Sequence, residues 1–242
     1  MKKTAAFFDI DGTISREGLI GEMFRKMITY ELIDNSKWYH EVEPAFIQWN
    51  KRLGDYDLYL QKMVDIYSET IKYTNPYHIS YIAKKVIEQK GERVYTYSRE
   101  RIKWHKEQRH VVIAISGSPS ELVKEMSEMY GMDDYKGTVY EIDENQAYSG
   151  KIIPMWDSES KRKAVLEMAE KHQLDLSKSY AYGDTAGDFS MLKLVGNPYA
   201  MNPTRELLTH ILKDDHLKEI VKIIVERKDV TYQLSVKTIQ FI

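Results

Sequence analysis

Three short apolar runs, each of which stops at a polar residue, constrain the fold of this chain most strongly. They span residues 4–8, 111–115 and 179–182, and they stop at Asp9, at Ser116 and, after Gly183, at Asp184. Short apolar or β-prone runs with such abrupt ends are typical of strands that are buried on both faces. We therefore expect three parallel strands whose carboxyl ends carry polar side chains.

Helical patterns separate these runs. Apolar residues recur with the helical period after the second run, before the third run and after it: Leu122, Val123, Met126 and Tyr130; Val165, Met168, Ala169 and His172; and Leu192. Strands that alternate with helices in this way need right-handed crossovers, which cover both faces of a sheet. The predicted fold is α/β, a doubly wound, Rossmann-like parallel sheet, and ligands bind such sheets beyond the carboxyl ends of the strands.

Residues 16–90 interrupt this alternation. They contain no convincing buried strand, and the helical period is carried by Leu19, Ile20, Met23, Phe24, Met27 and Ile28 and again by Leu58, Leu60, Met63, Val64 and Tyr67. We predict three or four amphipathic helices that form an inserted cap over the end of the first strand. The predicted domains are a catalytic core of residues 1–15 and 91–242 and a helical cap of residues 16–90.

Two further segments show strand patterns. Residues 138–142 and 147–152 flank a turn formed by Asp143, Glu144 and Asn145, which predicts a small hairpin. Residues 230–242 alternate apolar and polar side chains, which predicts an additional strand at an edge of the sheet.

Composition excludes several classes of function. The 35 Lys and Arg residues against 37 Asp and Glu residues give a net charge of −2, and the basic residues are scattered, so nucleic acid is not an expected partner. No apolar stretch approaches the roughly 20 residues that cross a bilayer, and Asp9 and Asp11 interrupt the first apolar run, so we expect a cytoplasmic protein without a membrane partner. The absence of Cys excludes thiolate chemistry and Cys-ligated metals. The oligomeric state stays open between monomer and homodimer.

The first strand ends in two carboxylates, Asp9 and Asp11, which are two positions apart and precede Gly12. In extended backbone both carboxylates point to the same side, and the glycine allows a sharp turn. The alternative interpretation is a strand followed by an ordinary Asp-Gly turn. The polar residues at the other strand ends favour a chemical role.

The second strand ends at Ser116 and Gly117, just before a predicted helix. We expect Ser118 to be the N-cap of this helix, with Pro119 at N1 and Glu121 completing a capping box at N3. Ser116 and Gly117 precede the cap, where free backbone N–H groups and the helix dipole favour an anion such as phosphate.

The third region combines cations with further carboxylates. Lys161 and Lys163 lie in the first turns of a predicted helix, where cations are unfavourable unless a negative group faces them; the alternative is two solvated surface lysines. Thr185 and Asp188 fit a second capping box, which leaves Asp184 without a structural explanation. Mg²⁺ would relieve the repulsion between Asp184 and the carboxylates of the first strand.

These motifs, in this order, resemble the phosphatases of the haloacid dehalogenase superfamily, in the branch with a helical cap after the first strand that includes phosphoserine phosphatase. The resemblance spans nearly the whole chain. It implies that Asp9 is the nucleophile and that Asp11 is the general acid and base. It also implies that Asp9, Asp184 and the backbone carbonyl of Asp11 hold Mg²⁺. Ser116, Gly117 and Lys161, chosen over Lys163 by its spacing to Asp184, would bind phosphate, and Asp188 would support the metal site or position Lys161.

Two positions depart from that pattern. Gly18 occupies the place where phosphoserine phosphatases carry a cap glutamate that binds the substrate amine, and Gly187 occupies a place that is often Asn. The first departure argues against L-phosphoserine as the substrate. Other cap residues are candidates for substrate selection, although each also has a packing or surface interpretation: Glu17, Glu22, Trp49, Lys51 and Arg52.

The sequence therefore predicts a Mg²⁺-dependent phosphomonoester hydrolase that acts on a small phosphorylated metabolite through an aspartyl-phosphate. A phosphotransferase of the same fold is one alternative, which product analysis with added alcohols would separate from hydrolysis. A catalytically silent protein that binds a phosphorylated ligand is another, although such a protein needs neither the second aspartate nor the metal.

Overall fold

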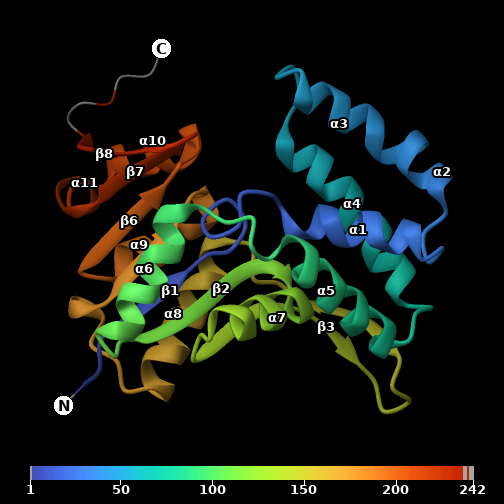
Figure 1. The fold of residues 1–242 in the computed structure, drawn as a ribbon, viewed down its shortest axis with the longest axis horizontal. Coiled ribbons are helices and arrows are strands. Elements are labelled where there is room, and N and C mark those ends of the chain that lie inside the picture. The colour runs from blue at the N-terminus through green and yellow to red at the C-terminus, as the bar shows by residue number, and fades with distance from the viewer. Residues whose placement is uncertain (1, 237–238, 240–242) are drawn as a thin grey trace.

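The computed structural model describes residues 2–236 and 239, and within them the strands form one eight-stranded sheet in the order β4-β3-β2-β1-β5-β6-β7-β8 (Figure 1). The strands are β1 (Ala5–Phe8), β2 (Val111–Pro119), β3 (Asp134–Ile142), β4 (Tyr148–Ile153), β5 (Tyr180–Gly183), β6 (Asn197–Met201), β7 (Lys222–Arg227) and β8 (Val230–Leu234). All neighbouring pairs are parallel except β3 with β4 and β7 with β8 at the two edges. The predicted α/β class and the predicted hairpin are confirmed.

Helices connect the strands. They are α1 (Leu19–Thr29), α2 (Asn35–Lys37), α3 (Glu43–Asn50), α4 (Tyr56–Ile71), α5 (Pro76–Lys90), α6 (Thr96–Glu107), α7 (Ser120–Tyr130), α8 (Ser158–Lys171), α9 (Phe189–Leu194), α10 (Arg205–Lys213) and α11 (Leu217–Ile220), with a π-helical segment (Trp38–Val42) and 3-10 turns at Leu176–Lys178 and Ala186–Asp188. None of the described helices is both long and apolar enough to span a membrane.

The core lies in two layers, one on each face of the sheet. Successive residues of β1 point to opposite faces, so Phe8 packs in the layer under α5, α6 and α7, whereas Phe7 packs in the layer under α8, α9 and α10. Both rings are fully buried. The crossovers on the two sides of β1 therefore lie on opposite faces, which makes the carboxyl end of β1 the switch point at which doubly wound sheets bind ligands.

Helices α1 to α5 occupy the segment for which the cap is predicted. In Figure 1, α1 to α4 lie together to one side of the sheet, whereas α5 lies beside α7. Capping fixes the start of α5, because Asn75 accepts a hydrogen bond from the backbone of Tyr77 and Pro76 occupies the first turn. The domain boundaries at residues 15/16 and 90/91 stay a prediction. At the other end of the chain, β8 confirms the predicted edge strand for Val230–Leu234, and the rest of that prediction falls largely outside the described residues.

One expected cap is wrong. Strand β2 continues to Pro119 instead of ending at residue 115, and α7 begins at Ser120, so Ser118 is not an N-cap and Glu121 closes no capping box. The Ser118 hydroxyl instead donates a hydrogen bond to the carboxylate of Asp11, which follows the neighbouring strand β1. The second expected capping box, formed by Thr185 and Asp188, is present.

Candidate active site

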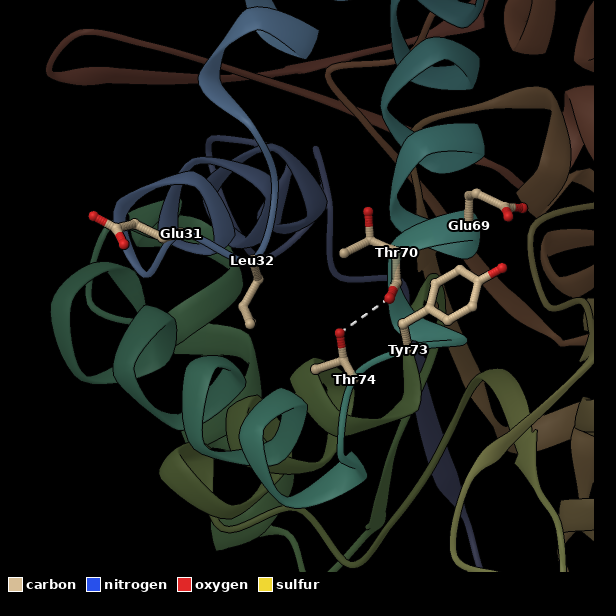
Figure 2. A pocket seen from close by; sticks show the side chains of 6 residues that line it. All are labelled: Glu31, Leu32, Glu69, Thr70, Tyr73 and Thr74. Carbon is tan, nitrogen blue, oxygen red and sulfur yellow. Dashed lines mark hydrogen bonds between the residues drawn. The ribbon is translucent and has the colours of Figure 1, made fainter.

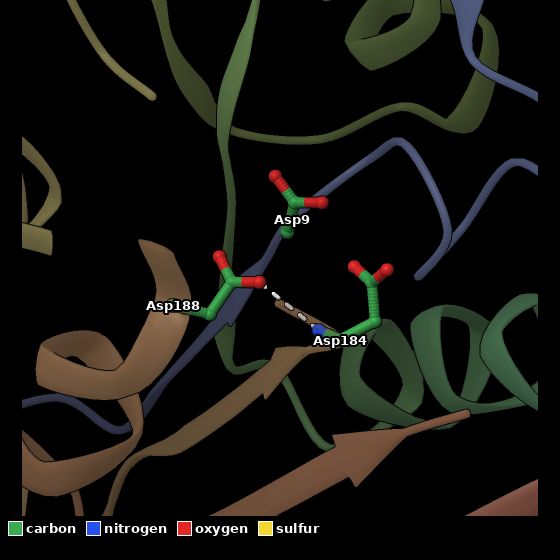
Figure 3. Close-up of side chains that lie close together, drawn as sticks. All are labelled: Asp9, Asp184 and Asp188. Carbon is green, nitrogen blue, oxygen red and sulfur yellow. Dashed lines mark hydrogen bonds between the residues drawn. The ribbon is translucent and has the colours of Figure 1, made fainter. Parts of the chain in front are cut away.

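The carboxyl ends of β1, β2 and β5 bring Asp9, Ser116 and Asp184 together. Phe8 is in register with Ala114 of β2 and with Tyr182 of β5, so Asp9, Ser116 and Asp184 lie one or two residues beyond paired positions of adjacent strands. Oxygen atoms of Asp9, Asp184 and Asp188 lie within 4.8 Å of one another, and Figure 3 shows these three side chains converging. All three residues are buried.

An aromatic stack holds the two central strand ends. The rings of Phe8 and Tyr182, which shortly precede Asp9 and Asp184, are parallel with centroids 4.2 Å apart. The Tyr182 hydroxyl accepts a hydrogen bond from Arg101 Nε at 3.0 Å and lies 2.9 Å from His105 Nε2. Burial lowers the pKa of His105 to about 2, so this imidazole is neutral and adds no charge behind the carboxylates.

Gly12 permits the close approach of Asp184. Its φ of +81° is unfavourable for other residues, and a Cβ atom at this position would collide with the Asp184 carboxylate. Thr13 Oγ1 also donates a hydrogen bond to Asp184 Oδ1 at 2.9 Å. The turn after β1 therefore orients the carboxylate of β5, a contact that an ordinary Asp-Gly turn would not need.

Lys161 is the cation of the site. Its Nζ lies 2.7 Å from Asp9 Oδ1 and 2.5 Å from Asp188 Oδ1, and only 4% of its side chain is exposed. Lys163, two residues further along α8, is 72% exposed and lies 3.8 Å from Glu159. The structure thus brings Lys161 to the carboxylates and leaves Lys163 on the surface.

Asp188 is committed to protein donors. Its Oδ1 binds Lys161, while its Oδ2 accepts hydrogen bonds from the backbone N–H groups of Asp184 and Thr185, both at 3.0 Å. Position 183 requires glycine, because a Cβ atom there would overlap the side chain of Asp188. These bonds suit a residue that positions Lys161 and the Asp184 loop.

Asp11 lies in a different environment from Asp9. Its Oδ2 accepts a hydrogen bond from Ser118 Oγ at 2.6 Å and lies 3.5 Å from Ser116 Oγ, and its Oδ1 accepts from the backbone N–H of Leu19 at 2.7 Å. Ser118 is therefore a residue that the sequence analysis missed, because its Ser-Pro-Ser-Glu context is also a typical helix start. The first turn of α1, in the cap, thus donates a backbone hydrogen bond to the Asp11 carboxylate.

The carboxylates of the site resist ionisation. Burial raises the pKa of Asp9 to about 8, Lys161 opposes that shift, and Asp188 and Asp11 add to it. Burial also raises the pKa of Asp184 and of Asp11. Burial alone would lower the pKa of Lys161, but Asp188 and Asp9 outweigh burial and raise it, so the ammonium stays charged.

This donor set fits a divalent cation. When ionised, the three clustered carboxylates exceed the single ammonium of Lys161 by two negative charges, all of them buried. Carboxylate and carbonyl oxygens are the ligands that Mg²⁺ prefers. Asp9 and Asp184 have oxygen atoms available for such an ion, whereas those of Asp188 are already bonded.

The segment around Trp156 packs against two glycines of the site. A Cβ atom on Gly117 would lie 2.9 Å from the Cβ of Trp156, and one on Gly187 would collide with the Trp156 carbonyl oxygen. The Gly117 carbonyl accepts a hydrogen bond from Thr138 Oγ1 at 2.8 Å. This packing is a physical reason for glycine at residue 187.

The predicted selectivity residues of the cap differ in burial and in the element that carries them. Glu22 is buried in α1, and Glu17 precedes that helix and is partly exposed. Arg52 is exposed in the connection between α3 and α4, where its φ is +61°. Glu17 and Glu22 form ion pairs with cations of the protein.

Sequence comparison decides the family. Residues 6–193 match the model of the haloacid dehalogenase-like hydrolases. The chain belongs to this family. The match covers β1, β2, β5 and α8, and therefore all the residues of the carboxylate cluster, so the predicted membership and the predicted hydrolase class are confirmed.

Individual relatives of this hydrolase carry different names. This chain is 26% identical over 210 residues to the "Inhibition of morphological differentiation protein" of Streptomyces azureus. The match covers 86% of this chain and 74% of that protein. The chain is 21% identical over 210 residues to a histidinol-phosphatase of Neisseria meningitidis, which covers 85% of this chain and 93% of that protein. A solved phosphoserine phosphatase that carries a phospho-aspartyl intermediate analogue shares the fold, with a TM-score of 0.57, 21% identity, and coverage of 95% of this chain and 96% of that one.

Proposed function

We propose that this hydrolase is a Mg²⁺-dependent phosphomonoesterase that works through a phosphorylated Asp9. One observation carries the proposal: two carboxylates that are two residues apart, Asp9 and Asp11, lie in different environments. Asp9 faces the Lys161 ammonium, whereas Asp11 faces hydroxyl and backbone donors. Such a pair suits a reaction that needs one ionised and one protonated carboxyl group.

In the first step an Asp9 oxygen attacks the phosphorus atom of the ester. The bond between phosphorus and the leaving-group oxygen breaks, and its electron pair stays on that oxygen. Asp11 donates its proton to the same oxygen, so the alcohol leaves as a neutral molecule. Burial raises the pKa of Asp11, which favours the protonated form that this step requires.

In the second step water attacks the phosphorus atom of the phosphorylated Asp9. Asp11, now ionised, takes a proton from the water, and the bond from phosphorus to the Asp9 oxygen breaks. Inorganic phosphate leaves and both carboxyl groups return to their starting forms. Ser116, Gly117 and Lys161 would bind phosphoryl oxygens in both steps. Two contacts support this assignment, since Lys161 Nζ lies 2.7 Å from Asp9 and Ser116 Oγ lies 3.5 Å from Asp11.

A bound Mg²⁺ would neutralise the repulsion between the phosphate ester and the buried carboxylates. Asp9, Asp184 and the Asp11 backbone carbonyl are the proposed ligands. Asp188 keeps Lys161 and the Asp184 loop in place through its four donors.

We further propose that the substrate is a small phosphomonoester. The phosphatase names among the relatives, histidinol-phosphatase and phosphoserine phosphatase, both denote enzymes for small metabolites. Their difference indicates that the family alone does not fix the leaving group. The cytoplasmic location stays a prediction.

Phosphate release from a panel of phosphomonoesters, with Mg²⁺ and with EDTA, tests the proposal. We expect Mg²⁺-dependent release by the wild-type protein and at least a ~10³-fold loss of kcat in Asp9→Asn, because the amide is not a nucleophile. Circular dichroism and a melting curve would establish that this variant is folded. Retained phosphatase activity in folded Asp9→Asn would contradict the proposal.

A further inference from the structure

The cap places an aromatic surface beside the proposed general acid. The backbone N–H of Leu19 donates to Asp11 Oδ1 at 2.7 Å, and Gly18 immediately precedes it as the N-cap of α1. A Cβ atom on Gly18 would lie only 3.0 Å from the hydroxyl oxygen of Tyr56. Tyr56, at the start of α4, therefore occupies the space that a side chain at residue 18 would take.

Tyr56 belongs to a group of packed rings. Trp49 lies nearly parallel to Tyr59, with an interplanar angle of 10° and centroids 5.4 Å apart, and its ring centroid is 5.1 Å from that of Tyr56. Phe46 packs behind Trp49 and Tyr59. Trp49 and Tyr56 remain 36% and 37% exposed, so this group, which we call the aromatic wall, presents ring surface to solvent.

The acids near Gly18 are already paired with cations of the protein. Glu22 lies 2.5 Å from Arg25 and 3.2 Å from Lys90, and Glu17 lies 2.9 Å from Arg93. A substrate ammonium would have to displace these intramolecular partners. At the start of α1, the leaving group would therefore meet the surface of aromatic rings more readily than an unpaired carboxylate.

We infer that the alcohol portion of the substrate carries an aromatic ring that packs on Trp49 and Tyr56. This inference rests on the proposed phosphatase function and adds the class of leaving group. When Asp9 attacks phosphorus, the leaving-group oxygen must face Asp11, and the first turn of α1 connects Asp11 to Gly18 and the aromatic wall. Ring-on-ring contact then selects the ester without a charged group in the cap.

A cavity elsewhere in the cap supplies a control. A space of about 340 Å³ lies at the opposite end of α1, where it is lined by Glu31, Leu32, Glu69, Thr70, Tyr73 and Thr74 (Figure 2). Tyr73 is an exposed aromatic residue of the cap, as Trp49 and Tyr56 are, but it lies with Glu31 and Leu32 past the C-terminal end of α1, away from Gly18. Its removal should not change the choice of leaving group.

The test compares primary alkyl phosphates whose leaving alcohols have similar acidity: 2-phenylethyl, 2-cyclohexylethyl and propyl phosphate, with phosphoserine and phosphoethanolamine as amine-bearing esters. We expect kcat/KM for the phenylethyl ester to exceed that for the propyl ester by about tenfold or more. In Trp49→Ala this ratio should fall most of the way to one, while Tyr73→Ala keeps the wild-type ratio. A preference for phenylethyl over cyclohexylethyl separates ring stacking from general apolar burial.

Two further measurements keep the inference open to refutation. Tyr56→Leu retains bulk if Trp49→Ala does not fold, and it should lower the same ratio. Calorimetric binding of 2-phenylethylphosphonate and propylphosphonate gives the preference without turnover. Absence of Mg²⁺-dependent turnover on every ester would contradict the proposed function, whereas turnover or phosphonate binding without a ring preference, or an unchanged ratio in folded Trp49→Ala, would overturn this inference alone.

Discussion

The strand ends and the cap of this hydrolase use polar side chains in opposite ways. At the strand ends, buried carboxylates outnumber the single cation Lys161, so the site carries excess negative charge when these carboxylates are ionised. In the cap, the acids near the start of α1 are matched by Arg25, Lys90 and Arg93, while aromatic rings stay partly exposed.

This difference teaches where each part of the function is located. Uncompensated buried charge is costly unless a ligand offsets it, so the carboxylates at the strand ends fit a bound cation. In the cap, the acids near the start of α1 carry no such excess charge, and Trp49 and Tyr56 leave ring surface exposed. Chemistry is therefore expected to fail when the strand ends are altered, and selectivity is expected to change when the cap is altered.

Removal of the buried cation should have the largest effect. Lys161→Met leaves Asp9 and Asp188 without their shared ammonium, and we expect kcat to fall by about 10³-fold because the phosphoryl charge also loses its partner. Lys163→Met is the matched control two residues away on α8. It should stay within about twofold of wild type, since its exposed ion pair contributes little. Equal losses in the two variants would refute the distinction.

A methyl group at Gly12 should be the next most damaging change. Gly12→Ala introduces both an unfavourable φ and a collision with the Asp184 carboxylate, and we expect at least ~10²-fold loss of activity with weaker Mg²⁺ binding. Gly150→Ala is the control, since Gly150 has a similar φ of +84° but only Lys72 Cε near a Cβ, at 3.7 Å. It should cost about 1–2 kcal/mol of stability and leave kcat unchanged. Normal Mg²⁺ affinity in Gly12→Ala would show that the turn does not orient Asp184.

Mg²⁺ affinity should rise with pH. The pKa of Asp9 is raised by burial from 3.8 to about 8 in the metal-free protein, so the folded chain holds a proton that the unfolded chain releases above about pH 4. For this group, the free energy of unfolding in EDTA therefore falls as pH rises from about 4 to 8. Mg²⁺ must displace the proton, which predicts about tenfold tighter binding per pH unit below pH 8.

Calorimetry in buffers of different ionisation enthalpy measures the proton released at each pH. Asp9→Asn should release less, although Asp184, whose pKa burial also raises, contributes in both proteins. Mg²⁺ binding that is independent of pH between 6 and 8 would contradict the assigned protonation.

Ser118→Ala should have the smallest effect. Its hydroxyl donates to Asp11 and lowers the pKa of that carboxyl group, so its removal should raise this pKa further. The basic limb of the kcat/KM profile, which reports loss of the Asp11 proton, should then shift to higher pH, with kcat lowered only a few-fold. An unchanged profile would show that Ser118 does not set the acidity of Asp11.

The strand ends could be predicted from sequence because local signals coincide there. A buried parallel strand needs a continuous apolar run, and the polar residue that follows it lies at the shared edge of the sheet, as Asp9 and Asp184 do. Ser116 follows the apolar run of β2 but still lies within that strand. Lys161 was separable from Lys163 only by spacing. Ser118 was misassigned because a hydroxyl before Pro119 looks the same whether it caps a helix or binds a carboxylate across the sheet.

The cap could be predicted only as a set of helices. The helical period of Leu19 to Ile28 predicts α1. It does not indicate that Tyr56 fills the space at Gly18 or that Lys90 pairs with Glu22. These contacts join elements far apart in the chain, and no local pattern encodes them. The sequence therefore indicates selectivity residues only by their place in the predicted cap, and their partners are visible only in the structure.

Trapping the phosphorylated enzyme tests the central claim most directly. Enzyme mixed with a turned-over phosphomonoester and Mg²⁺ is quenched in acid within one turnover, reduced with borohydride and mapped by mass spectrometry. An acyl-phosphate at Asp9 is reduced to homoserine at residue 9, which is the result that the account predicts. Rapid phosphate release with no modification at residue 9, or a modification at Asp11 instead, would contradict it.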